Sequence, residues 1–152
     1  MNLDDVLARE GIRDLVSRYN SYGDTGRFEP LFELFAEHAV METGNAGEEL
    51  TVYDGRENVK RIFTGAQGRM QDQAAAAGPS YIRHFTATHQ IDLIDADHAT
   101  GRCYFAVLMP SGLDHWGRYI DRYVRIDGDW RFEHRRVYVD GRGEGSWFAA
   151  TD

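Results

Sequence analysis

Cysteine, positive charge and long apolar runs are scarce in this sequence of 152 residues. Its single cysteine, Cys103, has no partner in the chain for a disulfide, and no CxxC pair or HExxH motif offers a sequence-local metal site. The longest strongly apolar run, 104–109, falls far short of the ~18 residues that span a bilayer. We therefore expect no structural zinc, no cofactor and no membrane association, while metal ligands that converge from distant strands stay open.

The deficit of positive charge excludes a further class of partner. Lys and Arg number 17 against 25 Asp and Glu, a net charge of −8, and such a balance repels phosphate backbones. Between 114 and 142 the arginines are interleaved with acidic residues, which indicates a salt-bridged sheet surface rather than a basic stripe. We expect no nucleic-acid partner.

What the sequence does contain indicates a globular protein. Hydrophobic residues make up 42%, too many for intrinsic disorder, and 152 residues is the usual size of one domain, here 1–152. The N-terminus MNLDDVLARE has neither the cationic start nor the apolar stretch of a signal peptide, which predicts a cytoplasmic location.

Helices are predicted in the first half of the chain, where apolar residues recur at three-and-four spacing. Asn2 can cap the first helix, whose apolar stripe begins with Leu3, Val6 and Leu7, and Gly23 is a natural left-handed stop. The pattern predicts helices over 2–22, 27–35 and 54–63 and a short strand over 39–43. Residues 64–80, rich in Gly, Ala and Gln, are expected to form a connection or a short frayed helix.

The second half of the chain changes to a period of two. Strands are predicted over 81–94, 99–109, 116–126 and 130–139. The Asp127-Gly128 turn between the last two is a strong hairpin signal, so successive strands should be antiparallel neighbours. Helices grouped before a run of strands indicate the α+β class, with the helices covering one face of a curved sheet.

Two motifs that could carry chemistry are set aside on context. The glycine-rich stretch 141–145 follows the last strand without room for a phosphate-binding helix, so we expect a flexible tail there. Cys103 sits inside an apolar strand, which favours a buried, inert thiol.

Asp24 and His84 are the remaining candidates. Asp24 comes just past the first helix, where its carboxylate can point between helices and sheet, and His84 lies near the start of the first long strand. Each also has a structural explanation, Asp24 as a turn or capping residue and His84 as a hydrogen-bonded sheet histidine. Spacing alone does not join the two.

The alternation along this strand raises a difficulty. His89 is five residues from His84, so on an unbroken strand it faces the opposite way, where Phe85, Ala87 and Ile91 also point. The more apolar face is then not the one that carries His84. A polar pocket face, a bulge between the two histidines, or an oligomer interface on the apolar face would each resolve this.

Several short motifs, in this order and spacing, resemble those of SnoaL-like members of the nuclear transport factor 2-like superfamily, also called cystatin-like. The resemblance covers almost the whole chain, and the matching segments are 12–40, 53–57, Arg83-His84-Phe85, 117–125 and 127–135. It implies a cone-shaped α+β fold, in which a curved antiparallel sheet has its concave face covered by the N-terminal helices. The chain looks most like the branch that includes scytalone dehydratase, bile-acid dehydratase and hexachlorocyclohexane dehydrochlorinase.

In that branch, a histidine on the first long strand and an aspartate after the first helix form a proton-abstracting dyad, and these positions fall on His84 and Asp24. The resemblance also places Arg135 at the pocket. The sequence departs from scytalone dehydratase at Met41-Glu42, where that enzyme looks to have a tyrosine, which puts its particular substrate in doubt.

The chemistry of such a dyad is simple. Imidazole, with a reference pKa of about 6.5, is suited to removing a proton next to a carbonyl near neutral pH. A carboxylate on its other nitrogen fixes the tautomer and stabilises the imidazolium. Donors for the developing charge would come from Tyr19, Tyr22, Tyr104, Tyr119 and Arg135. Tyr19 and Tyr22 also continue the helix's apolar stripe, which favours packing over catalysis.

Two functions remain open. The first is a cofactor-independent, dehydratase-like lyase or isomerase that acts on a small, largely apolar cyclic molecule. The second is a non-catalytic ligand-binding or structural subunit, such as a ring-hydroxylating dioxygenase β-like subunit. An exposed sheet face in this architecture needs to be covered, and Phe85, Ala87, Val107 and Val137 are apolar side chains suited to contact with a second copy. We therefore expect a homodimer or homotrimer.

Overall fold

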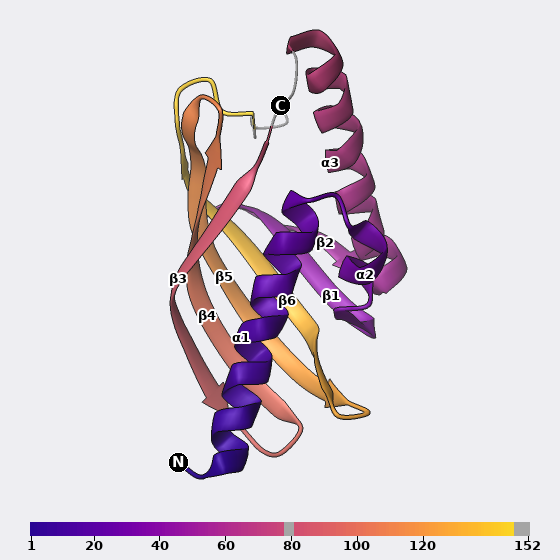
Figure 1. The fold of residues 1–152 in the computed structure, drawn as a ribbon, viewed down its shortest axis with the longest axis vertical. Coiled ribbons are helices and arrows are strands. Elements are labelled where there is room, and N and C mark those ends of the chain that lie inside the picture. The colour runs from indigo at the N-terminus through magenta and orange to yellow at the C-terminus, as the bar shows by residue number, and fades with distance from the viewer. Residues whose placement is uncertain (78–80, 148–152) are drawn as a thin grey trace.

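The chain folds into three helices and one six-stranded sheet (Figure 1). The computed structural model describes residues 1–77 and 81–147. The elements in chain order are α1 (Leu3–Asp24), α2 (Phe28–Phe32), β1 (Phe35–Asn45), β2 (Thr51–Asp54), α3 (Arg56–Ala77), β3 (Arg83–Leu93), β4 (His98–Met109), β5 (Gly112–Ile126) and β6 (Asp129–Arg142). The predicted α+β class is confirmed.

The strands lie in the order β2-β1-β6-β5-β4-β3, so the sheet is curved but not closed. Strands β3 to β6 pair antiparallel with their neighbours along the chain, as predicted. Strand β1, however, pairs parallel with β6, which makes the sheet mixed rather than wholly antiparallel. Between β1 and β6 the chain passes through β2, α3 and three hairpin turns. No tight turn joins the two strands directly, so they are not forced to be antiparallel.

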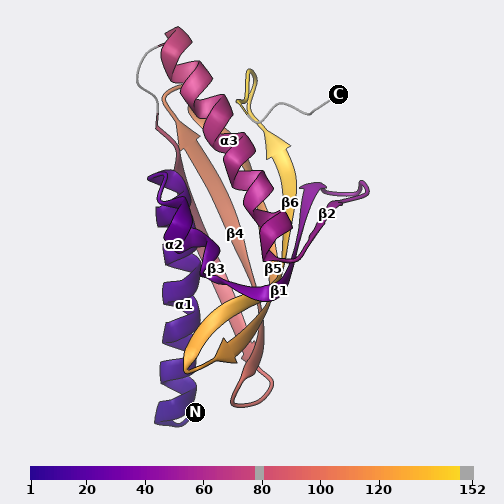
Figure 2. The same cartoon turned by 90° about the vertical axis from the view of Figure 1, so that its right-hand side faces the viewer.

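All three helices lie on one face of the sheet, which we call the inner face (Figure 2). Helix α1 packs against β3 and β6, and α3 packs against β1 and β2. Asn2 caps α1 by a capping box with Asp5, and Ile12 and Val16 of its apolar stripe are buried. The core therefore lies between α1 and the inner face.

The apolar stripe of α1 is not buried along its whole length. Leu3, Val6 and Leu7 are exposed. Figure 1 shows this end of α1 level with the β3–β4 turn, at the end of the sheet.

Some predicted boundaries are wrong. The second helix ends at Phe32 and β1 begins at Phe35, because β1 finds partners on both sides, β2 and β6, and extends to eleven residues. The sequence reading missed β2, which has only four residues. Of the two alternatives for 64–80, a connection or a short frayed helix, residues 64–77 are helical but continue α3, and 78–80 lie outside the described residues.

Candidate functional site

A pocket of about 170 Å³ opens between the helices and the inner face of the sheet. Its wall is largely apolar and is formed by side chains from all three helices and five strands. Two histidines, His84 and His115, are among the few ionisable groups that line it. The apolar part of the wall includes Phe28, Met41, Ile62, Phe63, Met70, Ile82, Phe105, Val137 and Val139.

Asp24 and His84 meet at this pocket. His84 Nδ1 lies 2.5 Å from Asp24 Oδ1, and the backbone N–H of His84 donates to Asp24 Oδ2 over 2.8 Å. The Asp24 side chain is only 9% exposed and that of His84 21%. Both carboxylate oxygens are therefore used, which fixes the carboxylate against β3 and leaves His84 Nε2 as the nitrogen for proton exchange.

The end of α1 delivers Asp24 to this position. Helix α1 includes Asp24 as its last residue, and the left-handed turn follows at Gly26, with φ +70°, rather than at the predicted Gly23. A positive φ is free of steric cost for glycine, so the chain can reverse directly after the carboxylate.

A β-bulge resolves the alternation of β3. The register with β4 shifts between Ala87 and Gln90, and Thr88 has φ +53°. The extra residue turns the second half of the strand over. His84 and Ile91 therefore both reach the inner face, while Phe85 stays 57% exposed on the outer face. Of the three resolutions left open above, the structure has the bulge.

The pocket holds a second histidine–aspartate pair that the sequence reading missed. His115 Nδ1 lies 2.7 Å from Asp114 Oδ2, and these side chains are 6% and 1% exposed. Burial lowers the pKa of His115, against the raising effect of Asp114. The available signal is an acid followed by a histidine just before the strand predicted over 116–126, but the charge pattern of 114–142 indicates only a salt-bridged sheet surface.

The stretch after β6 is held against this second pair. The Ser146 hydroxyl and the Trp147 backbone N–H donate to the two carboxylate oxygens of Asp114, each over 2.7 Å. Gly143 N–H donates to the Asp114 carbonyl. Residues 143–147 are thus anchored, and the flexible tail expected over 141–145 is corrected. The anchoring brings Trp147 to the pocket wall.

The predicted substrate-binding residues divide into two groups. Tyr19 and Tyr119 line the pocket, and the Tyr119 hydroxyl donates to Asn20 Oδ1. Tyr22 instead accepts a hydrogen bond from Arg18 and carries Arg27 on its ring, away from the pocket wall. Tyr104 is 53% exposed, because it alternates with the buried Cys103 and faces outward.

Arg135 lies beneath the pocket rather than in its wall. It is fully buried and donates two hydrogen bonds to Asp121, of 2.9 and 2.8 Å. Its guanidinium carbon is 4.0 to 4.2 Å from the ring centroids of Tyr19, Tyr119 and Phe132. It is on the predicted face of the sheet, but the two tyrosines stand between it and the pocket and make it a buried support for them.

Comparison with known proteins gives the family. The family model of the SnoaL-like domain matches residues 4–136. The chain belongs to this SnoaL-like domain family. No curated protein matches the chain. A putative scytalone dehydratase from Novosphingobium aromaticivorans DSM 12444 has 20% identity and a TM-score of 0.77, covering 99% of this chain and 95% of that one.

Two other solved structures have the same fold. LinA is 21% identical, with a TM-score of 0.74 and 97% of each chain covered. The β subunit of a putative aromatic-ring-hydroxylating dioxygenase, also from Novosphingobium aromaticivorans DSM 12444, is 16% identical, with a TM-score of 0.71, covering 91% of this chain and 93% of that one. At these identities the likeness is evidence for the fold alone.

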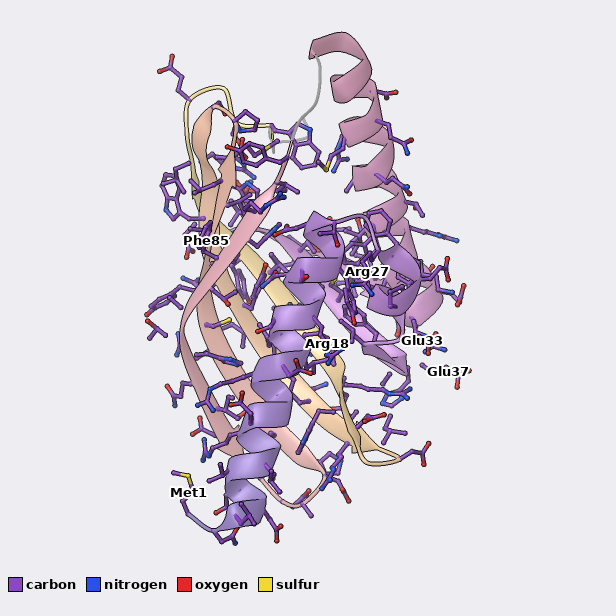
Figure 3. All side chains as sticks on the ribbon, viewed as in Figure 1. Met1, Arg18, Arg27, Glu33, Glu37 and Phe85 are labelled. Atoms are coloured by element: carbon purple, nitrogen blue, oxygen red, sulfur yellow. The ribbon has the colours of Figure 1, made fainter. Side chains whose placement is uncertain are left out.

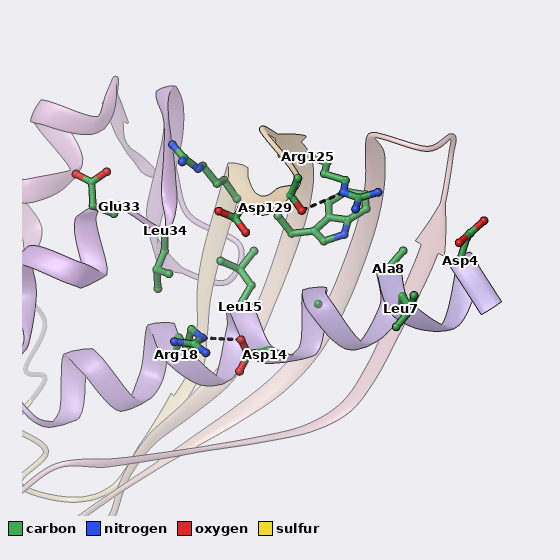
Figure 4. A pocket seen from close by; sticks show the side chains of 14 residues that line it. Asp4, Leu7, Ala8, Asp14, Leu15, Arg18, Glu33, Leu34, Arg125 and Asp129 are labelled. Carbon is green, nitrogen blue, oxygen red and sulfur yellow. Dashed lines mark hydrogen bonds and ion pairs between the residues drawn. The ribbon is translucent and has the colours of Figure 1, made fainter.

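A larger and more polar hollow in this SnoaL-like domain lies between α1 and the β5–β6 turn (Figure 4). Its volume is about 590 Å³, and none of the predicted site residues lines it. Several of its charged groups are engaged with near neighbours, as Arg18 is with Asp14 and Arg125 with the Gly128 carbonyl. These contacts are local ion pairs and turn hydrogen bonds, so this hollow offers no comparable chemistry.

Among residues 1–77 and 81–147 of the domain, no three His, Cys, Asp or Glu side chains gather closely enough to hold a metal ion. No helix there is long and apolar enough to cross a membrane. Burial raises the pKa of Cys103 to about 11, which keeps its thiol protonated.

Proposed function

We propose that this SnoaL-like domain is a cofactor-independent, dehydratase-like lyase or isomerase in which His84 removes a proton from carbon. Asp24 orients the imidazole through Nδ1 and stabilises the imidazolium that forms. The observation that carries the proposal is the 2.5 Å contact between His84 Nδ1 and Asp24 Oδ1 at the wall of a largely apolar pocket.

The pocket supports a small, largely apolar cyclic substrate. A volume of about 170 Å³ is close to the ~150 Å³ of an apolar cavity that holds benzene, so one six-membered ring fits it. The aromatic and aliphatic wall, to which Tyr19 and Tyr119 contribute, favours the ring. Because water is largely excluded by such a wall, hydrogen bonds to a developing enolate gain strength.

The test is turnover of a single-ring β-hydroxyketone. 3-Hydroxycyclohexanone loses water to form 2-cyclohexenone, whose conjugated enone is followed by its ultraviolet absorbance. His84→Gln and Asp24→Asn should each lower kcat/KM at least about 100-fold, the lower end of what general acid–base groups contribute. Their thermal midpoints should stay near that of the wild type.

A matched control is present in the chain. His98 and Asp95 form a similar pair, with Nδ1 2.9 Å from Oδ1, but at the exposed β3–β4 turn and outside the pocket. His98→Gln should leave turnover unchanged. Full activity in either His84→Gln or Asp24→Asn contradicts the proposal. A wild-type protein that binds the ketone without converting it favours the non-catalytic binding subunit.

A further inference from the structure

Two histidines approach one pocket from different strands, His84 from β3 and His115 from β5. Their ring centroids are 6.4 Å apart and their planes lie at 85°. Each has Nδ1 against a buried carboxylate, Asp24 or Asp114, so each would exchange protons with a bound molecule through Nε2. The rings are too far apart to share a hydrogen bond but close enough to touch opposite ends of one small substrate.

We propose that His115 is a second catalytic residue of this site, which exchanges a proton with the substrate oxygen while His84 exchanges one with carbon. The proposal rests on the proposed function above and deepens it, since it assigns the group that protonates the leaving hydroxyl. The substrate class is then a small cyclic alcohol with its hydroxyl on the carbon β to a carbonyl.

Elimination balances with these two groups alone. His84 Nε2 takes the proton from the α-carbon, and the electron pair of the C–H bond forms the enolate of the neighbouring carbonyl; when the carbonyl re-forms, that electron pair becomes the C=C bond. The C–O bond breaks with its electron pair going to oxygen, and protonated His115 gives its Nε2 proton to that oxygen, which leaves as water. By microscopic reversibility, hydration of the alkene uses neutral His115 to accept the proton of water and the His84 imidazolium to protonate carbon.

The surroundings of Asp114 support a positioning role for this carboxylate. It accepts hydrogen bonds from His115, from the Ser146 hydroxyl and from the Trp147 backbone N–H, and it is almost completely buried. A carboxylate held by several donors stays ionised, and these hydrogen bonds lower the pKa of Asp114 although its burial raises it. Held in this way, Asp114 keeps the Nδ1 proton on His115 and fixes the imidazole ring at the pocket wall.

Two reactions of one probe separate the two histidines. In D2O, 3-hydroxycyclohexanone exchanges its α-proton for deuterium, seen by proton NMR, whenever a base removes that proton. Elimination to 2-cyclohexenone needs the proton donor as well. His115→Gln should keep exchange within about threefold of the wild type and lower elimination at least about 100-fold, whereas His84→Gln should lower both. His98→Gln serves as the control and should change neither.

Each outcome decides between the proposals. Elimination by His115→Gln within about threefold of the wild-type rate overturns the role of His115 and leaves the proposed function standing. Loss of exchange together with elimination, in a His115→Gln protein that keeps its thermal midpoint, also overturns the division of roles. A wild-type protein that neither exchanges nor eliminates overturns the proposed function, and this inference with it.

The wild-type protein gives a second readout that no folding defect can affect. Elimination needs protonated His115 and exchange does not, so the ratio of elimination to exchange should fall as the pH rises. Burial lowers the pKa of His115, as do the charges of His84 and Arg142, while Asp114 raises it, and the fall should therefore begin below about pH 6.5. A ratio that stays flat from about pH 5 to about pH 8 overturns the inference.

Discussion

At the scale of single residues, burial decides what a histidine beside an aspartate can do. His98 and Asp95 meet on the surface, where the hydrogen bond that His98 donates to Asp95 raises the pKa of His98. In the pocket His115 has an equally close carboxylate, yet burial lowers its pKa. The exposed pair favours the charged imidazolium and the buried pair the neutral imidazole, so the protonated form of His115 that elimination needs becomes more populated as the pH falls.

Arg135 and Asp121 show the same principle for an ion pair. Both side chains are fully buried, and the Tyr123 hydroxyl donates to the same carboxylate. Replacing one partner leaves the other charge buried without compensation, so Asp121→Asn should lower the free energy of unfolding by about 3 to 5 kcal/mol. Urea denaturation at neutral pH measures this change.

The control for that prediction is a pair at the surface. Arg118 and Asp140 lie 3.1 Å apart, but their side chains are 36% and 32% exposed. Asp140→Asn should cost less than about 1 kcal/mol, because solvent screens such pairs. An Asp121→Asn protein as stable as Asp140→Asn would mean that Arg135 tolerates burial without a charged partner.

At the scale of elements, the spacing of apolar residues predicts individual strands and helices. It does not predict which elements contact one another. The four long strands and the capped first helix follow from local patterns. Strand β2 has only four residues, and its pairing with β1 depends on a partner that no local pattern reveals. The contact between Asp24 and His84, 60 residues apart, came only from the family resemblance.

The bulge in β3 is the element on which the site depends. Thr88 has φ +53°, and a β-branched residue is strained in that region, whereas asparagine tolerates it. Thr88→Asn should therefore raise the free energy of unfolding by about 0.5 to 1 kcal/mol, measured by urea denaturation. Activity should be kept, because His84 still faces the pocket.

Thr86→Asn is the matched control, since Thr86 precedes the bulge on the same strand and pairs with Phe105 in the regular ladder. There asparagine replaces a good strand former at an extended position and should be neutral or destabilising. If both substitutions destabilise the protein equally, the strain assigned to Thr88 is not relieved by asparagine.

At the scale of the whole molecule, depth below the surface is the property that sequence patterns predict least well. The family resemblance places Arg135 at the pocket, but only the packing of Tyr19 over the guanidinium shows that Arg135 is sealed off. The expected covering residues fail for a related reason. Val107 is fully buried and Val137 lines the pocket, so both face inward.

The outer face nevertheless carries an apolar patch of other residues. Exposed large hydrophobic side chains gather on β3, β4 and β5, namely Phe85, Tyr104, Leu108, Leu113 and Trp116. Phe85, labelled in Figure 3, lies opposite Ala106, which lies opposite Trp116, so the three form one row across the sheet. Contiguous exposed apolar surface of this kind is typical of protein–protein interfaces.

We therefore expect this patch to be the contact of a homodimer or homotrimer. Light scattering after size-exclusion chromatography should give a mass two or three times the 17.3 kDa of one chain. The double change Phe85→Glu and Trp116→Glu should shift the mass to that of one chain, because two unpaired carboxylates would be buried at each contact. Val52→Glu, at a 59% exposed valine on β2, should not. A wild-type protein of 17.3 kDa at every concentration would contradict the expectation and leave the patch open to another partner.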